Sequence, residues 1–177
     1  MKTLEDAWRW YHATRDNLLR MHRLAHRHWQ GLPWEGPLGR DDDFRMLEDS
    51  TVVTETKYGL DFLDDLTVVV LFSVFEQTIR DQIRDEVREE SVGLSHPVLK
   101  KAAEDVTLAI EVGSFARVLE PYKAEHADLI EEVNQVRRYR NWVAHGRRGE
   151  QPPSVAPRMA FERMSRFLEI VIPDTAS

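Results

Sequence analysis

The stretch from Asp61 to Glu90 contains neither glycine nor proline, and it constrains the fold of this 177-residue chain more than any other feature. Its first half is almost wholly apolar, and its second half repeats apolar residues with the period of a helix. The valine-rich first half alone would also suit a buried strand, but no turn residues separate it from the helical second half. We therefore predict one long central helix over about residues 61–90.

Glycine and proline divide the rest of the chain into shorter segments. Residues 3–30 predict an amphipathic helix, because Thr3 is a suitable N-cap and apolar residues follow it at helical spacing. Residues 31–39 have the composition of a loop. For residues 41–58 the sequence leaves two possibilities. Three aspartates could start a short helix, whereas the β-branched residues at 51–54 suggest a strand.

The second half of the chain predicts further helices at about residues 97–112, 114–120, 123–144 and 157–172. Ser95 precedes the first of these as an N-cap, and Gly146 follows the third as a stop signal. We predict an all-α helical bundle of five to seven helices that forms a single domain. Its core spans residues 61–172, and residues 1–58 form an N-terminal helix and loop region.

Composition narrows the chemistry that the chain can perform. Lys and Arg number 24 against 31 Asp and Glu, and the formal net charge of −7 excludes a uniformly basic nucleic-acid coat. The absence of cysteine excludes disulfides, cysteine-ligated metals and thiolate nucleophiles. The N-terminus lacks the apolar core of a signal peptide, and the longest apolar run, residues 68–75, is too short to cross a membrane. We expect a cytoplasmic protein with no membrane partner.

Two charged residues interrupt apolar helix faces. Arg140 falls within a stripe of core-facing residues on the helix before Gly146, and Glu76 points the same way as the apolar side of the central helix. A buried charge must be paired or must line a cleft. Arg140 alone would be explained by a side chain that extends its charged end to water. If the two meet, they form either a buried ion pair that fixes the packing or a guanidinium aimed at a ligand's phosphate.

Residues 137–148 are the most informative stretch, with five arginines and no acidic residue in a chain of negative charge. Such a run is often only a solvated helix face, but this one brackets Asn141 and His145. Arg140 and His145 lie about 140° apart on a continuous helix and therefore diverge. They can converge if the helix ends near Ala144, or with copies supplied by a second subunit.

Residues 140–145, Arg-Asn-Trp-Val-Ala-His, resemble the R-N-x(3)-H motif of HEPN (higher eukaryotes and prokaryotes nucleotide-binding) domains. The following glycine gives the form that is common among the family's ribonuclease toxins. The Phe75–Glu76 pair on the preceding long helix, with arginines after it, is also similar to that family. The all-helical layout extends the resemblance loosely over residues 61–172, whereas the N-terminal 58 residues match no pattern of the family.

The resemblance implies a metal-independent endoribonuclease in which two copies of the motif meet at a homodimer interface. Arg140 would bind and polarise the scissile phosphate, His145 would act as general acid or base, and Asn141 would hold the phosphate or backbone by hydrogen bonds. Glu76 would orient Arg140. A forked, permanently charged guanidinium suits developing phosphorane charge, an imidazole exchanges protons near neutral pH, and the RNA 2′-hydroxyl supplies the nucleophile.

The flanking side chains are expected to contact RNA. Arg137, Arg138, Arg147 and Arg148 would bind its backbone. Trp142 is a candidate platform for stacking a base, although tryptophans are more often core or interface residues. The implied partners are RNA, a second copy of the chain and an antitoxin protein.

Metal and cofactor sites are not expected. His22 and His26 share a helix face, but arginines surround them and no glutamate completes a metalloprotease motif, so a solvated or RNA-facing helix is the better explanation. The aspartates at 41–43 fit an acidic loop or helix start better than a magnesium site. The leading hypothesis is a ribonuclease toxin of a toxin–antitoxin pair or of phage defence. The alternatives are a catalytically inactive HEPN-fold domain that binds nucleotide or protein, and a helical protein–protein module.

Overall fold

The computed structural model describes residues 3–172, and within them the chain forms helices, turns and loops without a β-strand. The α-helices are α1 (Leu4–His28), α2 (Asp42–Arg45), α3 (Asp49–Glu90), α4 (Pro97–Val112), α5 (Phe115–Leu119), α6 (Lys123–Ala144) and α7 (Pro157–Val171). Short 3₁₀ turns, η1 (Trp29–Gly31), η2 (Pro37–Arg40) and η3 (Glu120–Tyr122), complete the secondary structure of this range. The prediction of an all-α helical bundle is confirmed.

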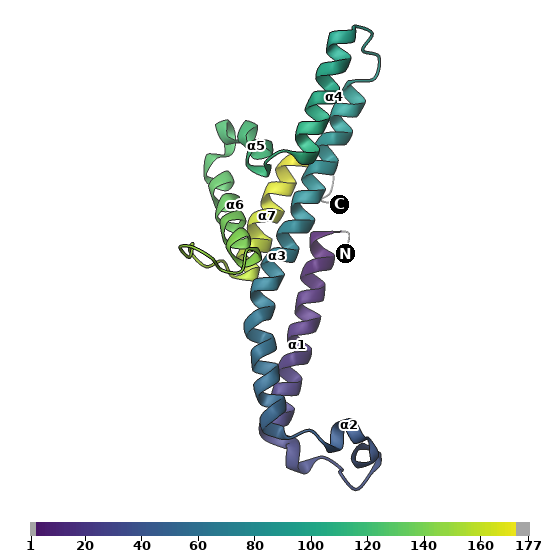
Figure 1. Cartoon of the computed structure of the whole chain (residues 1–177), viewed down its shortest axis with the longest axis vertical. Coiled ribbons are helices and arrows are strands. Elements are labelled where there is room, and N and C mark those ends of the chain that lie inside the picture. Colours follow the sequence, from purple (N-terminus) through teal and green to yellow (C-terminus); the bar gives the residue numbers. More distant parts are fainter. Residues whose placement is uncertain (1–2, 173–177) are drawn as a thin grey trace.

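The helix α3 is the spine of the molecule (Figure 1). It has 42 residues, so at a rise of about 1.5 Å per residue it is about 63 Å long. The helix α1 packs along one half of α3, and α4 returns along the other half as the second arm of a hairpin. Helices α6 and α7 pack against the middle, which gives an elongated molecule (Figure 1).

The start of α3 differs from the prediction. This helix begins at Asp49 rather than at about residue 61, and the β-branched residues at 51–54 are helical. The physical reason is tertiary packing, because Val52 is buried against Trp29 at the end of α1. Burial on a neighbouring helix outweighs the weak local preference for a strand.

The other predicted helix ends lie close to the observed ones. Thr3 caps α1, since its Oγ1 accepts a hydrogen bond from the N–H of Asp6 at 3.1 Å. The helix α4 begins at the predicted proline, but its N-cap is His96 rather than Ser95, with Nδ1 accepting from the N–H of Val98 at 3.3 Å. Both ends of α6 are as predicted.

The main core lies where α3, α5, α6 and α7 meet. Phe75 is at its centre, with edge-to-face contacts to the rings of Phe115 and Phe167 at centroid distances of 5.7 and 5.8 Å. Val133 and Val136 of α6 are fully buried in the same cluster. This packing holds α6 against the segment of α3 that carries Glu76.

No helix within residues 3–172 is long and apolar enough to cross a membrane. Over the same residues, no group of three or more metal-ligating side chains comes together. His22 is directed at α3, where its Nδ1 lies 3.1 Å from the hydroxyl of Thr56.

Candidate functional site

The residues that resemble the HEPN motif lie at the C-terminal end of α6, which is closed by a Schellman turn. The N–H of Gly146 donates to the carbonyl of Val143 at 3.1 Å, and the N–H of Arg147 donates to the carbonyl of Trp142 at 2.8 Å. Gly146 has a φ of +74°, in the left-handed region that favours glycine. The helix therefore ends where Gly146 predicts, and His145 is the first residue beyond it.

Arg140 lies between α6 and α3, with its side chain 27% exposed. Its Nη2 lies 3.7 Å from Oε2 of Glu76, and its Nη1 donates to Oδ1 of Asn141 at 2.9 Å. The guanidinium also lies over the ring of Phe72, 5.3 Å from the ring centroid. Its Nε is buried and has no hydrogen-bond partner within residues 3–172. Glu76 and Arg140 thus meet across the bundle, as the two charges in apolar stripes suggest.

Glu76 is shared between two arginines. While Oε2 faces Arg140, Oε1 accepts from Nη2 of Arg80 at 2.7 Å and from its Nε at 3.1 Å. Arg80 also donates to the backbone carbonyls of Ile110 and Gly113 at the C-terminal end of α4. Arg80 was not predicted to belong to the site, although its position four residues after Glu76 is the spacing of helical ion pairs. Through Glu76, the end of α4 is tied to Arg140.

His145 is exposed and lines an open pocket at the end of α6. The residues around this pocket are Arg138, Asn141, Trp142, His145, Arg148, Glu150 and Pro152. Arg138, Asn141 and His145 follow one another at spacings of three and four residues, so they lie on one face of the helix end. Arg140 is not among the lining residues. One chain therefore gathers Asn141 and His145, but it does not bring Arg140 into the same pocket.

Asp65 on α3 fastens the end of α6 to the spine. It accepts a hydrogen bond from the hydroxyl of Tyr139, and it forms an ion pair with Arg147. The guanidinium of Arg147 also lies over the rings of Phe62 and Trp142, at 5.5 and 5.7 Å from their centroids. Burial and the hydrogen bond to Asp65 raise the pKa of Tyr139 to about 12. These contacts fix the path of the chain after α6. Asp65 was not predicted to contact it, because its partners are distant in the sequence.

The other side chains expected to contact RNA differ in their exposure and in the contacts that they already make within the chain. Arg148 is exposed at the pocket. Arg138 lines the pocket as well, but it forms an ion pair with Glu131. Arg137 is half-buried and hydrogen-bonded within α6. Trp142 is half-buried with its Nε1 enclosed, so it offers less of a stacking surface than the sequence suggests.

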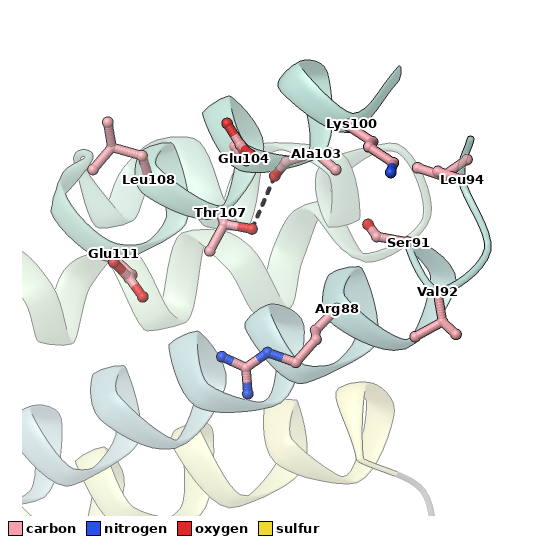
Figure 2. Close-up of a pocket in the computed structure, with 10 residues that line it drawn as sticks. All are labelled: Arg88, Ser91, Val92, Leu94, Lys100, Ala103, Glu104, Thr107, Leu108 and Glu111. Atoms are coloured by element: carbon pink, nitrogen blue, oxygen red, sulfur yellow. Dashed lines mark hydrogen bonds between the residues drawn. The ribbon is translucent and has the colours of Figure 1, made fainter. Parts of the chain in front are cut away.

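A larger groove lies away from the motif, between α3 and α4 at the tip of their hairpin (Figure 2). Its lining includes the charged side chains of Arg88, Glu104 and Glu111 beside the apolar side chain of Leu108. None of the motif residues lines it, so this groove is not part of the candidate site.

Searches of protein-family models, of curated proteins and of solved structures find no match to this chain. What the site can do follows from its chemistry. A paired, partly exposed guanidinium, an amide and an exposed imidazole lie at one helix end, beside further arginines.

Proposed function

We propose that the protein is a metal-independent endoribonuclease that uses Arg140, Asn141 and His145, and that it is the toxin of a toxin–antitoxin or phage-defence system. The observation that carries the proposal is the placement of Arg140, a guanidinium kept partly buried beside Glu76 and Phe72. It lies five residues before an exposed imidazole at a helix end. The resemblance of residues 140–145 to the R-N-x(3)-H motif supplies the reaction class.

Arg140 is assigned to the scissile phosphate. Glu76 holds one edge of its guanidinium, so the cation is oriented before RNA arrives. A forked cation binds two phosphate oxygens at once, and an oriented one stabilises the negative charge that builds up on the phosphorane. Asn141 accepts from Arg140 through Oδ1, which leaves its amide N–H groups for the RNA backbone.

His145 is assigned to proton transfer. It takes the proton of the 2′-hydroxyl or returns one to the leaving 5′-oxygen. The 2′-oxygen bonds to the adjacent phosphorus as the P–O5′ bond breaks, which leaves a 2′,3′-cyclic phosphate and a 5′-hydroxyl. The substrate supplies the nucleophile, so neither a thiolate nor a metal-bound hydroxide is required. Arg138 and Arg148, beside His145 in the pocket, are assigned to the RNA backbone.

A homodimer is part of the proposal, because Arg140 and His145 of one chain do not line one pocket. A two-fold axis near the end of α6 would bring Arg140 of one subunit towards His145 of the other. Exposed apolar side chains lie close by on α3, where Tyr58 is 65%, Phe62 40% and Leu66 52% exposed. An apolar stripe beside a charged rim has the composition of a protein interface.

The proposal is tested by incubating the purified protein with single-stranded RNA, and with DNA of the same sequence, in EDTA. We expect cleavage of the RNA alone, with cyclic-phosphate and 5′-hydroxyl product ends, by a protein that light scattering shows to be dimeric. Expression of the wild type should arrest cell growth, and expression of His145→Ala should not. A requirement for magnesium or cleavage of DNA would contradict the mechanism, and an active monomer would contradict the dimer.

A catalytically inactive domain of the same fold, which binds nucleotide or a protein, is the second candidate. The observation in its favour is that the guanidinium of Arg140 already contacts Glu76 and Asn141 within the chain. His145 lies in a pocket that Arg140 does not line. In that case nucleotide or RNA would bind without being cut, and His145→Ala would leave the cell's growth as it is with the wild type.

A further inference from the structure

The side chain of Arg80 is enclosed where α3 meets the end of α4. It is 14% exposed, and its guanidinium lies over the ring of Phe115, 5.4 Å from the ring centroid. Its Nη1 donates to the carbonyl of Ile110, and its Nη2 donates to the carbonyl of Gly113 at 3.0 Å. These carbonyls belong to the last turn and the C-cap of α4, where a cation also complements the helix dipole. The end of α4 therefore holds the guanidinium of Arg80 in place.

Glu76 makes a closer contact with Arg80 than with Arg140. Its Oε1 accepts two hydrogen bonds from Arg80, at 2.7 Å from Nη2 and at 3.1 Å from Nε. Its Oε2 lies 3.7 Å from Nη2 of Arg140, which is too long for a hydrogen bond. Within residues 3–172, the guanidinium of Arg140 donates only to the uncharged amide of Asn141. The carboxylate is thus hydrogen-bonded to one arginine and merely close to the other.

The two guanidinium groups and the one carboxylate together carry one net positive charge. Within residues 3–172, Glu76 is the one acidic side chain that forms an ion pair with either Arg80 or Arg140. Because Arg80 is the closer partner, Glu76 neutralises mainly the charge of Arg80, and the excess positive charge lies on Arg140. A partly exposed cation with excess charge attracts anions such as the phosphates of RNA.

We propose that Arg80 is a positioning residue that keeps Glu76 from closing on Arg140, so that the charge of Arg140 stays available to the scissile phosphate. The inference takes its ligand, RNA, from the proposed function. Without Arg80, Oε1 of Glu76 loses both of its hydrogen bonds, and a partly buried carboxylate needs replacements for them. The guanidinium of Arg140 is already 3.7 Å from Oε2. A small rotation of either side chain would complete a hydrogen-bonded ion pair and neutralise Arg140.

This role differs from simple structural support in the sign of one measurement. If Arg80 only supported Glu76, removing Arg80 would let the carboxylate move and would weaken its contact with Arg140. If Arg80 competes with Arg140 for Glu76, removing Arg80 strengthens that contact. A double-mutant cycle separates the two cases, because the effects of residues that share a partner do not add.

The cycle measures, by urea unfolding of the full chain, how much Arg140→Gln lowers the folding equilibrium constant. In the Arg80→Gln background this factor should be at least about three times larger than in the wild type. Arg80→Lys is the milder second background, because an ammonium cannot reproduce the fork of Arg80, and its factor should also exceed that of the wild type. Arg84→Gln is the matched control and should leave the factor unchanged, since Arg84 pairs with Asp81 instead of Glu76. Factors equal to or below the wild-type factor in both Arg80 backgrounds would overturn the proposal.

The second measurement is the affinity for RNA with methylated 2′-hydroxyls, which reports binding without cleavage. Arg80→Gln should weaken binding at least about threefold, and adding Glu76→Gln should restore it, because Arg140 then has no carboxylate to pair with. Adding Asp81→Asn instead restores the same net charge without changing Glu76, and it should not restore binding. Restoration by Asp81→Asn, or unchanged binding by Arg80→Gln, would overturn the proposal. A wild type that binds no RNA would contradict the proposed function, whereas the urea cycle would still decide whether Arg80 competes for Glu76.

Discussion

Glu76 determines how much freedom Arg140 has. Its two carboxylate oxygens face two guanidinium groups, Arg80 on the same helix and Arg140 on α6. Arg140 is therefore held by a carboxylate that Arg80 keeps in place, while the uncharged contacts to Phe72 and Asn141 complete its surroundings. An oriented cation in a partly buried site is what transition-state stabilisation of a phosphate requires.

Replacing Glu76 with alanine should lower both stability and activity. Glu76 and Arg140 are 22% and 27% exposed, so the loss should fall below the roughly 3–5 kcal/mol of a fully buried pair. We expect roughly 1.5–3 kcal/mol, the range for hydrogen bonds to charged groups, and a smaller loss for Glu76→Gln. Urea unfolding of the wild type and of both variants measures the loss in free energy of unfolding.

Glu162→Ala is the matched control for Glu76→Ala. Glu162 accepts from Arg158 at 2.7 Å in a pair that is 52% and 80% exposed, and exposed pairs contribute about 1 kcal/mol or less. If both alanine variants lost the same stability, the special role of Glu76 would be wrong.

The contribution of Tyr139 to the free energy of unfolding should decrease at alkaline pH. Burial and Asp65 raise its pKa from 10.0 to about 12, so the folded state holds the phenolic proton more tightly than the unfolded state. The contribution to stability is complete below pH 10 and is lost as the pH rises through 12. The difference in unfolding free energy between the wild type and Tyr139→Phe should shrink over that window. A difference that stays constant with pH would contradict this assignment.

At the residue scale, the sequence predicts the contacts that leave a mark in the helix pattern. Glu76 and Arg140 are recognisable because each is a charge in an apolar stripe. The pairing of Arg80 with Glu76 could also have been predicted, because the two residues are four apart on one helix. No local sequence pattern indicates the contact of Asp65, because its partner Arg147 is distant in the chain and lies beyond a helix end.

At the scale of the element, the end of α6 is encoded by one glycine. Gly146 adopts a φ of +74°, and nothing lies within 4 Å of where a Cβ would be placed. Gly146→Ala should therefore cost about 1–2 kcal/mol through the backbone conformation alone.

Gly31→Ala is the control for this substitution, because Gly31 also has open space around it and does not have a positive φ. It should change stability by no more than about 0.5 kcal/mol. Thermal unfolding of the two variants decides the matter, and equal shifts would mean that the Schellman turn does not depend on glycine.

The extent of α3 shows where local patterns stop being informative. The absence of glycine and proline predicts the helix over residues 61–90, but the β-branched residues at 51–54 favour a strand. Their helical state depends on α1, against whose end Val52 is buried. A contact between helices that are distant in sequence has no local signal, so this boundary was not predictable.

At the scale of the whole molecule, α3 separates two regions of the surface. The motif end of α6 contacts the middle of α3, and the hairpin with α4 extends beyond it (Figure 1). Contacts of Arg80 and Glu76 join the end of α4 to Arg140. The all-α fold was predictable from helix periodicity, whereas this arrangement along the spine depends on tertiary contacts alone.

The central claim is that His145 performs proton transfer in RNA cleavage, and the rate of cleavage by His145→Ala in EDTA tests it most directly. The matched control is His28→Ala, which removes an exposed histidine at the end of α1. We expect His145→Ala to fold like the wild type and to lose roughly 10²–10⁴-fold in rate, while His28→Ala keeps the wild-type rate. A folded His145→Ala protein that cleaves RNA as fast as the wild type would contradict the account.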